Sequence, residues 1–80
     1  MAEFIGSYDG FGYHAHWTRV TAHRLIWSAT VRNADAQWCG APSGMMADEG
    51  MSDAECQGAV QLVVEMSIRD GIGVDRDIED

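Results

Sequence analysis

The chain has 80 residues, enough for one domain, and 46% of them are hydrophobic, so it can build a core of its own. Its formal net charge is −8, with 13 acidic residues against five arginines and no lysine, and so acidic a surface repels nucleic-acid phosphates. The sequence has neither a signal-peptide pattern nor an apolar run near the roughly 18 residues of a membrane span. We therefore expect a cytoplasmic protein that contacts neither nucleic acid nor membrane.

The first part of the chain has the pattern of β-strands. Residues 1–10 hold several apolar side chains and end in an Asp-Gly pair typical of a tight turn, so they form either a short first strand or an ordered arm. Residues 11–24 alternate with period two, which puts Trp17 on one face and His14 and His16 on the other. This alternation predicts the first full strand of a sheet.

Two further strands are predicted before the helix. Residues 25–32 alternate again, and we expect their apolar set to face the helix. After an Asn-Ala-Asp turn, residues 36–41 predict a third strand, which Pro42 stops or confines to a sheet edge because proline cannot donate to the ladder. Residues 43–50 predict a loop. The set expected to face the helix is Leu25, Trp27, Ala29 and Val31.

The clearest predicted element is a helix over residues 52–70. Ser52 and Glu55 have the spacing of a capping box, in which each side chain bonds to the other residue's backbone amide. Gly71 supplies the left-handed residue that ends helices, and Ile72 can fold back onto the last turn. Spacings of three and four predict a buried stripe and an opposite solvated face. The stripe is Cys56, Ala59, Val60, Val63, Val64 and Ser67, and the solvated face is Gln57, Gln61 and Glu65.

These elements predict an α+β fold: a three-stranded antiparallel sheet, with a fourth strand left open, packed on one C-terminal helix. Residues 1–74 form this β-β-β-α domain, and residues 75–80 form an acidic tail. The sheet face that carries His14 and His16 is too polar to be a second core. We expect it to be either solvated or paired across a homodimer.

This organisation resembles small bacterial β-β-β-α domains, among them the HicB-like antitoxin domain. The resemblance covers roughly residues 11–72 and rests on an alternating strand led by an aromatic residue (27–31), the capping-box segment (50–56) and the apolar stripe that follows. It implies the same arrangement of sheet and helix. It also implies a function, the inhibition of a small basic ribonuclease that acts as a toxin.

His14 and His16 are the best candidate metal ligands. Residues two apart on a strand point the same way and lie about 6.5–7 Å apart, so two imidazoles can share a metal ion. A third ligand would have to come from His23, Cys39 or a carboxylate, and the sequence does not decide among them. The alternative interpretation is that both histidines simply face solvent on the polar side of the sheet.

The two cysteines predict no catalytic thiol. Cys39 lies in a predicted strand and Cys56 on the apolar stripe, so we expect both to be small buried hydrophobic residues. A disulfide between them stays open if the compartment is oxidising. With no nucleophile placed beside a base, we expect no enzymatic activity and no cofactor.

The aromatic and methionine residues support two interpretations. In the first, Trp17, Trp27 and Trp38 are all core residues, one from each strand. In the second, Trp38 lies with Met45 and Met46 at an exposed rim and binds a partner, because aromatic residues and methionine are enriched at interfaces.

The function predicted from the sequence is that of a small, non-catalytic acidic protein that binds another protein or a second copy of itself, as a regulator or accessory factor. One alternative is an antitoxin-like inhibitor whose acidic residues engage a basic RNase. A further alternative is a metal-binding protein that uses the histidines.

Overall fold

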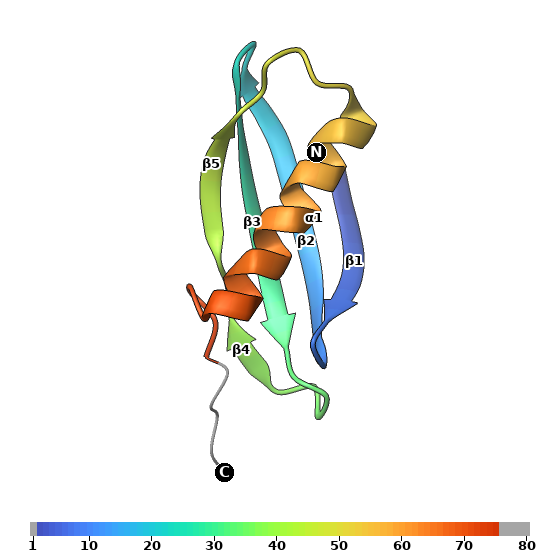
Figure 1. Ribbon diagram of the computed structural model, residues 1–80, viewed down its shortest axis with the longest axis vertical. Coiled ribbons are helices and arrows are strands. Elements are labelled where there is room, and N and C mark those ends of the chain that lie inside the picture. Colours follow the sequence, from blue (N-terminus) through green and yellow to red (C-terminus); the bar gives the residue numbers. More distant parts are fainter. Residues whose placement is uncertain (1, 76–80) are drawn as a thin grey trace.

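The computed structural model describes residues 2–75, which form one antiparallel sheet and one helix (Figure 1). The predicted α+β class, with a sheet packed on a C-terminal helix, is confirmed. Residues 76–80 of the predicted acidic tail lie outside the described residues. In chain order the elements are β1 (Ala2–Tyr8), β2 (Phe11–Thr21), β3 (Arg24–Arg32), β4 (Trp38–Gly40), β5 (Ser43–Ala47) and α1 (Asp53–Asp70).

The first ten residues are part of the sheet. Strand β1 pairs with β2 along its whole length, and the two are joined by a tight turn in which Asp9 and Gly10 both have positive φ. Of the two alternatives for this segment, strand or ordered arm, the strand is therefore correct. It forms one edge of a sheet whose order is β1-β2-β3-β4.

The other edge is divided between two short strands, and here the predicted loop over residues 43–50 is wrong for residues 43–47, which form β5, and correct for residues 48–50. Strand β4 pairs with the last residues of β3, whereas β5 pairs with the first half of the same strand. Pro42 lies at the break, where its carbonyl accepts the amide of Ala29 at 2.9 Å. A proline has no N–H to donate but keeps an acceptor, so the edge of β3 stays hydrogen-bonded where the strand is interrupted.

The core lies between the sheet and α1, which crosses one face of the sheet diagonally (Figure 1). The predicted alternation is confirmed, because the odd-numbered apolar side chains of β2 and β3 all point toward the helix. Each fully buried aliphatic side chain stabilises the fold by about 1.5–3 kcal/mol. The buried sheet residues are Tyr13, Ala15, Trp17, Leu25, Trp27, Ala29 and Val31, and the helix contributes Cys56, Val60, Val64 and Ile68.

Two side chains differ in burial from a position considered in the sequence analysis: Trp38 as a core residue and Glu65 as a solvated one. The side chain of Trp38 is 58% exposed, so it is not a core residue, and the alternative of an exposed position is correct. Glu65, predicted to be solvated, is half-buried and accepts the hydroxyl of Tyr13 at 2.7 Å. Burial and this bond raise the pKa of Tyr13 well above its usual range. A buried phenol needs an acceptor, and Glu65 provides it.

Both ends of α1 have the predicted caps. The Ser52 hydroxyl accepts the Glu55 amide at 3.2 Å, and the Glu55 carboxylate accepts the Ser52 amide at 3.1 Å, which completes the capping box. Gly71 is left-handed, with φ of 70°. The amide of Ile72 then donates to the carbonyl of Ser67 at 2.9 Å, as expected when a helix ends at such a glycine.

After α1 the chain turns back and adds one more pairing to the sheet. Gly73, with φ of 71°, makes the bend, and the buried Val74 forms an antiparallel bridge with Gly40. The amide of Asp75 donates to the carbonyl of Cys39 at 2.7 Å. Strand β4 is therefore hydrogen-bonded on both sides, to β3 and to the segment that follows the helix.

A single arginine fastens the loop between β5 and α1 to the sheet. Arg19 extends from β2 on the helix side, 5.5 Å from the centre of the Trp17 ring. Its guanidinium donates to the carboxylates of Asp48 and Asp53, each at 2.5 Å, and to the Met51 carbonyl at 2.7 Å. The side chain of Asp48 is only 3% exposed, and a buried carboxylate is stable in its charged form only beside a partner such as the Arg19 guanidinium.

The helix contains one glycine whose replacement should stabilise the protein. Gly58 lies in the interior of α1, is exposed, and has no atom within 4 Å of the position that a Cβ would take. We expect Gly58→Ala to raise the free energy of unfolding by about 1 kcal/mol, because alanine loses less backbone entropy in a helix. Urea denaturation measures this. A lower midpoint than that of the wild-type protein would contradict the exposed position of Gly58.

Candidate functional site

The sheet has a second face, opposite α1, which none of the described elements covers. We call it the open face, and in Figure 1 it is turned away from the viewer. It is built from alternate residues of four strands, the ones that do not point into the core. Its side chains are Glu3 and Ile5 of β1, His14, His16 and Thr18 of β2, Arg24, Ile26, Ser28, Thr30 and Arg32 of β3, and Met45 of β5.

Three ionisable side chains meet on this face. The pairing of β1 with β2 puts Glu3 directly opposite His16, and His14 lies two residues before His16 on the same face. The Glu3 Oε2 atom lies 3.6 Å from Nε2 of His14 and 3.4 Å from Nδ1 of His16. The two imidazole rings are 4.4 Å apart, centre to centre. These three residues are hereafter the His–Glu cluster.

The nitrogen of His16 that faces Glu3 is buried without a hydrogen bond. Its Nδ1 atom has almost no accessible surface, yet the contact with Glu3 lacks hydrogen-bond geometry. Most buried side-chain nitrogens and oxygens in proteins do have a partner. The cluster thus brings together two nitrogens and a carboxylate oxygen, the atom types that bind transition metals, and one of them is unsatisfied.

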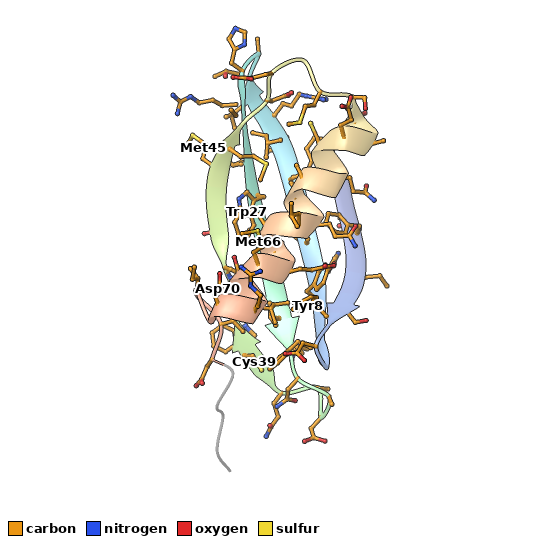
Figure 2. All side chains as sticks on the ribbon, in the orientation of Figure 1. Tyr8, Trp27, Cys39, Met45, Met66 and Asp70 are labelled. Carbon is orange, nitrogen blue, oxygen red and sulfur yellow. The ribbon has the colours of Figure 1, made fainter. Side chains whose placement is uncertain are left out.

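A shallow apolar groove lies beside the cluster. It has a volume of about 460 Å³, and its lining includes Thr18, Ile26, Met45 and His16 of the cluster. Ile26 is 41% exposed and Met45 is 56% exposed, although both are large hydrophobic residues. In Figure 2 Met45 projects at the β5 edge of the sheet, whereas Trp27 lies between β5 and the helix in this view. The predicted polar character of this face is therefore correct for its histidines and threonines but not for Ile26 and Met45.

The charged residues are distributed unevenly between the open face of the sheet and the helix on the opposite face. Glu3 is the only acidic residue within the five strands, and Arg24 and Arg32 belong to the same face. The helix by contrast contains four acidic residues and one arginine. The open face is accordingly close to neutral in a protein whose net charge is −8.

The structure separates the other predicted site residues. Trp38 pairs with Arg32 at one end of the outer edge, and Met45 pairs with Ile26 at the other, so they do not form a single patch. Met46 is half-buried and packs against the core instead.

Neither alternative ligand proposed for the histidines joins them. His23 lies exposed in the turn between β2 and β3, and Cys39 is buried on the helix side. Cys56 is also buried and free, as the sequence predicts for a small hydrophobic residue. The third member of the cluster is Glu3, which the sequence pattern does not single out among the carboxylates.

Among the described residues no helix has the length and hydrophobicity needed to cross a membrane. Comparison with known proteins finds no family model, no curated protein and no solved structure that matches this chain.

Proposed function

We propose that this chain is a non-catalytic protein-binding domain, that the open face of the sheet is its contact surface, and that a second copy of the chain is the partner that binds there. The observation that carries the proposal is the groove beside Ile26 and Met45, two exposed hydrophobic side chains on a face that no described element covers. Exposed apolar surface of this kind is typical of interaction sites.

Charge favours a second copy as the occupant. Two chains that each carry a net charge of −8 repel one another over most of their surfaces. The open face avoids this repulsion, because its one acidic residue, Glu3, is accompanied by Arg24 and Arg32. A two-fold axis can set residues of opposite sign against each other across such a face.

The dimensions of the molecule also favour a second copy of the chain as the partner. The molecule measures 44 by 17 by 17 Å, so a sheet face along its length is close to the roughly 800 Å² per partner that stable interfaces bury. A short chain also has a thin core, and burying a second surface adds to its stability.

An inhibitor of a basic RNase is the second candidate, and a different observation favours it. Helix α1 carries Asp53, Glu55, Glu65 and Asp70 against the single cation Arg69, so the helix side is acidic. A basic protein would bind that side rather than the open face. This agrees with the function implied by the resemblance to HicB-like domains.

Sedimentation equilibrium on three variants tests the proposal. Ile26→Glu and Met45→Glu each place a charge in the groove, and we expect either one to weaken self-association at least about tenfold. Leu62→Glu is the matched control, because Leu62 is a comparably exposed hydrophobic residue on the helix side. We expect it to leave self-association unchanged.

Salt distinguishes the two candidates. Self-association of two acidic chains should become tighter as salt rises, because screening reduces their repulsion, whereas binding of a basic RNase should become weaker. A chain that stays monomeric at every concentration and salt level contradicts the proposal. So does a dimer that Leu62→Glu dissociates and Ile26→Glu does not.

A further inference from the structure

We infer that the His–Glu cluster of Glu3, His14 and His16 is a binding site for a divalent transition metal of the zinc type. The three side chains come from two adjacent strands of one chain, so the site does not require self-association. Two imidazoles and one carboxylate are a ligand set that zinc uses in sites where the fourth position is left for water.

The spacing of the cluster fits a tetrahedral ion. Ligands that lie about 2.0–2.1 Å from zinc are separated from one another by about 3.3–3.4 Å. The Glu3 oxygen is 3.4 Å from the His16 nitrogen and 3.6 Å from the His14 nitrogen, so two of the three edges already have nearly this length. All three atoms lie within 4.8 Å of one another. The remaining edge has to close by at most about 1.4 Å, which small rotations of the imidazoles supply.

The unsatisfied nitrogen of His16 is a second, independent indication. A histidine that merely faces solvent has water to bond with, but Nδ1 of His16 is buried and has no hydrogen bond. It points into the cluster, 3.4 Å from the Glu3 carboxylate. A metal ion bound between them would satisfy this nitrogen and balance the carboxylate charge.

The surroundings decide which metals fit. Nitrogen ligands favour zinc, copper and nickel over magnesium and calcium, which prefer oxygen. The Glu3 and His14 side chains are 63% and 46% exposed, so the ion can enter from solvent and keep a water molecule on its outer side. The strands hold the backbone of all three residues in one register, which keeps the ligands close before the metal arrives.

Isothermal titration of chelator-stripped protein with ZnCl₂ tests the site. We expect one zinc ion per chain, and no saturable binding of magnesium. Glu3→Gln and His16→Gln should each weaken zinc binding at least about tenfold, because even residues outside the ligand shell cost 10- to 100-fold. Cobalt absorption adds a geometric readout, since a tetrahedral site gives intense visible bands that the variants should lose.

The control is the third histidine. His23→Gln removes an exposed imidazole from the β2–β3 turn and should leave zinc affinity unchanged. If His23→Gln weakens binding as much as His16→Gln, the metal is captured adventitiously and the inference is wrong. It is equally wrong if the wild-type protein binds no zinc, or if Glu3→Gln binds as tightly as the wild-type protein.

Two variants separate loss of the metal site from unfolding and from loss of self-association. Glu3 is exposed at the edge of the sheet, so Glu3→Gln leaves the fold intact, and melting in the presence of chelator verifies this. The Ile26→Glu variant keeps all three ligands, so zinc binding by that variant measures the metal site without self-association. A wild-type chain that binds zinc but stays monomeric would count against the proposed function alone.

Discussion

Replacement of Arg19 by methionine is expected to lower the melting temperature by about 10 °C or more. Methionine keeps much of the stem that lies near Trp17 but removes every hydrogen bond that the guanidinium makes. The main loss is at Asp48, whose buried carboxylate would be left without its cationic partner. A buried charge without a partner destabilises a fold strongly. The loop that leads into α1 would lose its attachment through the Met51 carbonyl as well.

The same variant should change how stability depends on pH. The hydrogen bond from Arg19 holds the pKa of Asp48 below its usual range, whereas an aspartate in the unfolded chain has a pKa of about 3.9. A carboxyl whose pKa is lowered by folding stabilises the protein above the unfolded value, and this contribution is lost as the pH falls through the folded value. The difference in melting temperature between wild type and Arg19→Met should therefore narrow below about pH 4.

Thermal melts followed by circular dichroism between neutral and acid pH measure both effects. Arg24→Met is the matched control, since Arg24 lies on the open face and its guanidinium donates to the sulfur of the exposed Met45, at 3.5 Å, rather than to a buried carboxylate. Its melting temperature should stay near that of the wild-type protein. Adding Asp48→Asn to Arg19→Met should restore part of the loss. Equal effects of Arg19→Met and Arg24→Met would contradict the role given to Asp48.

Replacement of Gly40 by alanine is the second large expected effect. A Cβ at this position would overlap the Gly73 carbonyl oxygen and lie 2.9 Å from the Val74 Cα. Both are backbone atoms, so no side-chain rotation relieves the overlap. The segment after the helix has to move away from β4, which breaks the bridge between Gly40 and Val74 and exposes Val74 to solvent. We expect a loss of about 2–3 kcal/mol in the free energy of unfolding.

Urea denaturation measures this loss, and hydrogen exchange locates it. The Asp75 amide, bonded to the Cys39 carbonyl at 2.7 Å, should exchange faster in the variant than in the wild-type protein. Gly12→Ala is the control, because a Cβ on this strand glycine would have no atom within 4 Å and its φ is not positive. If Gly40→Ala were as stable as Gly12→Ala, the close packing of the C-terminal segment on β4 would be wrong.

Local chemistry made the helix and the central strands predictable. The capping box at Ser52, the left-handed Gly71 and the period-two alternation around Trp17 and Trp27 each depend on neighbours in the sequence, and all are confirmed. Strand β5 is not predicted because residues 43–47 include Gly44 and Ala47, two residue types that are depleted in strands, and no β-branched or aromatic residue. Pairing with the free edge of β3 outweighs that propensity.

The remaining errors have long-range causes. Trp38 is exposed because it pairs with Arg32, whose side chain lies on the open face, and this pairing follows a register shift between β3 and β4 that no local pattern indicates. In the sequence Arg19 is an ordinary polar member of an alternating strand. Its partners Asp48 and Asp53 lie 29 and 34 residues away, and only the folded chain brings them together.

Glu3, the third member of the His–Glu cluster, can be placed from the sequence only once β1 is known to be a strand. A two-residue turn at positions 9 and 10 fixes the register of the hairpin around it, so each residue of β1 pairs with the residue equally far beyond the turn. This register places Glu3 opposite His16, as the structure does. The Asp-Gly pair alone does not decide whether the residues before it form a strand or an arm. The register argument applies only if they form a strand, because an arm is not paired with β2.

Intermolecular nuclear Overhauser effects in a mixed sample of labelled and unlabelled chains test the central claim, that the open face is the contact surface, most directly. The account predicts contacts between copies from the methyl groups of Ile26 and Met45, which lie on that face. Contacts confined to Leu62 and Met66 on the helix side, or none at concentrations where the chain sediments as a dimer, would contradict it.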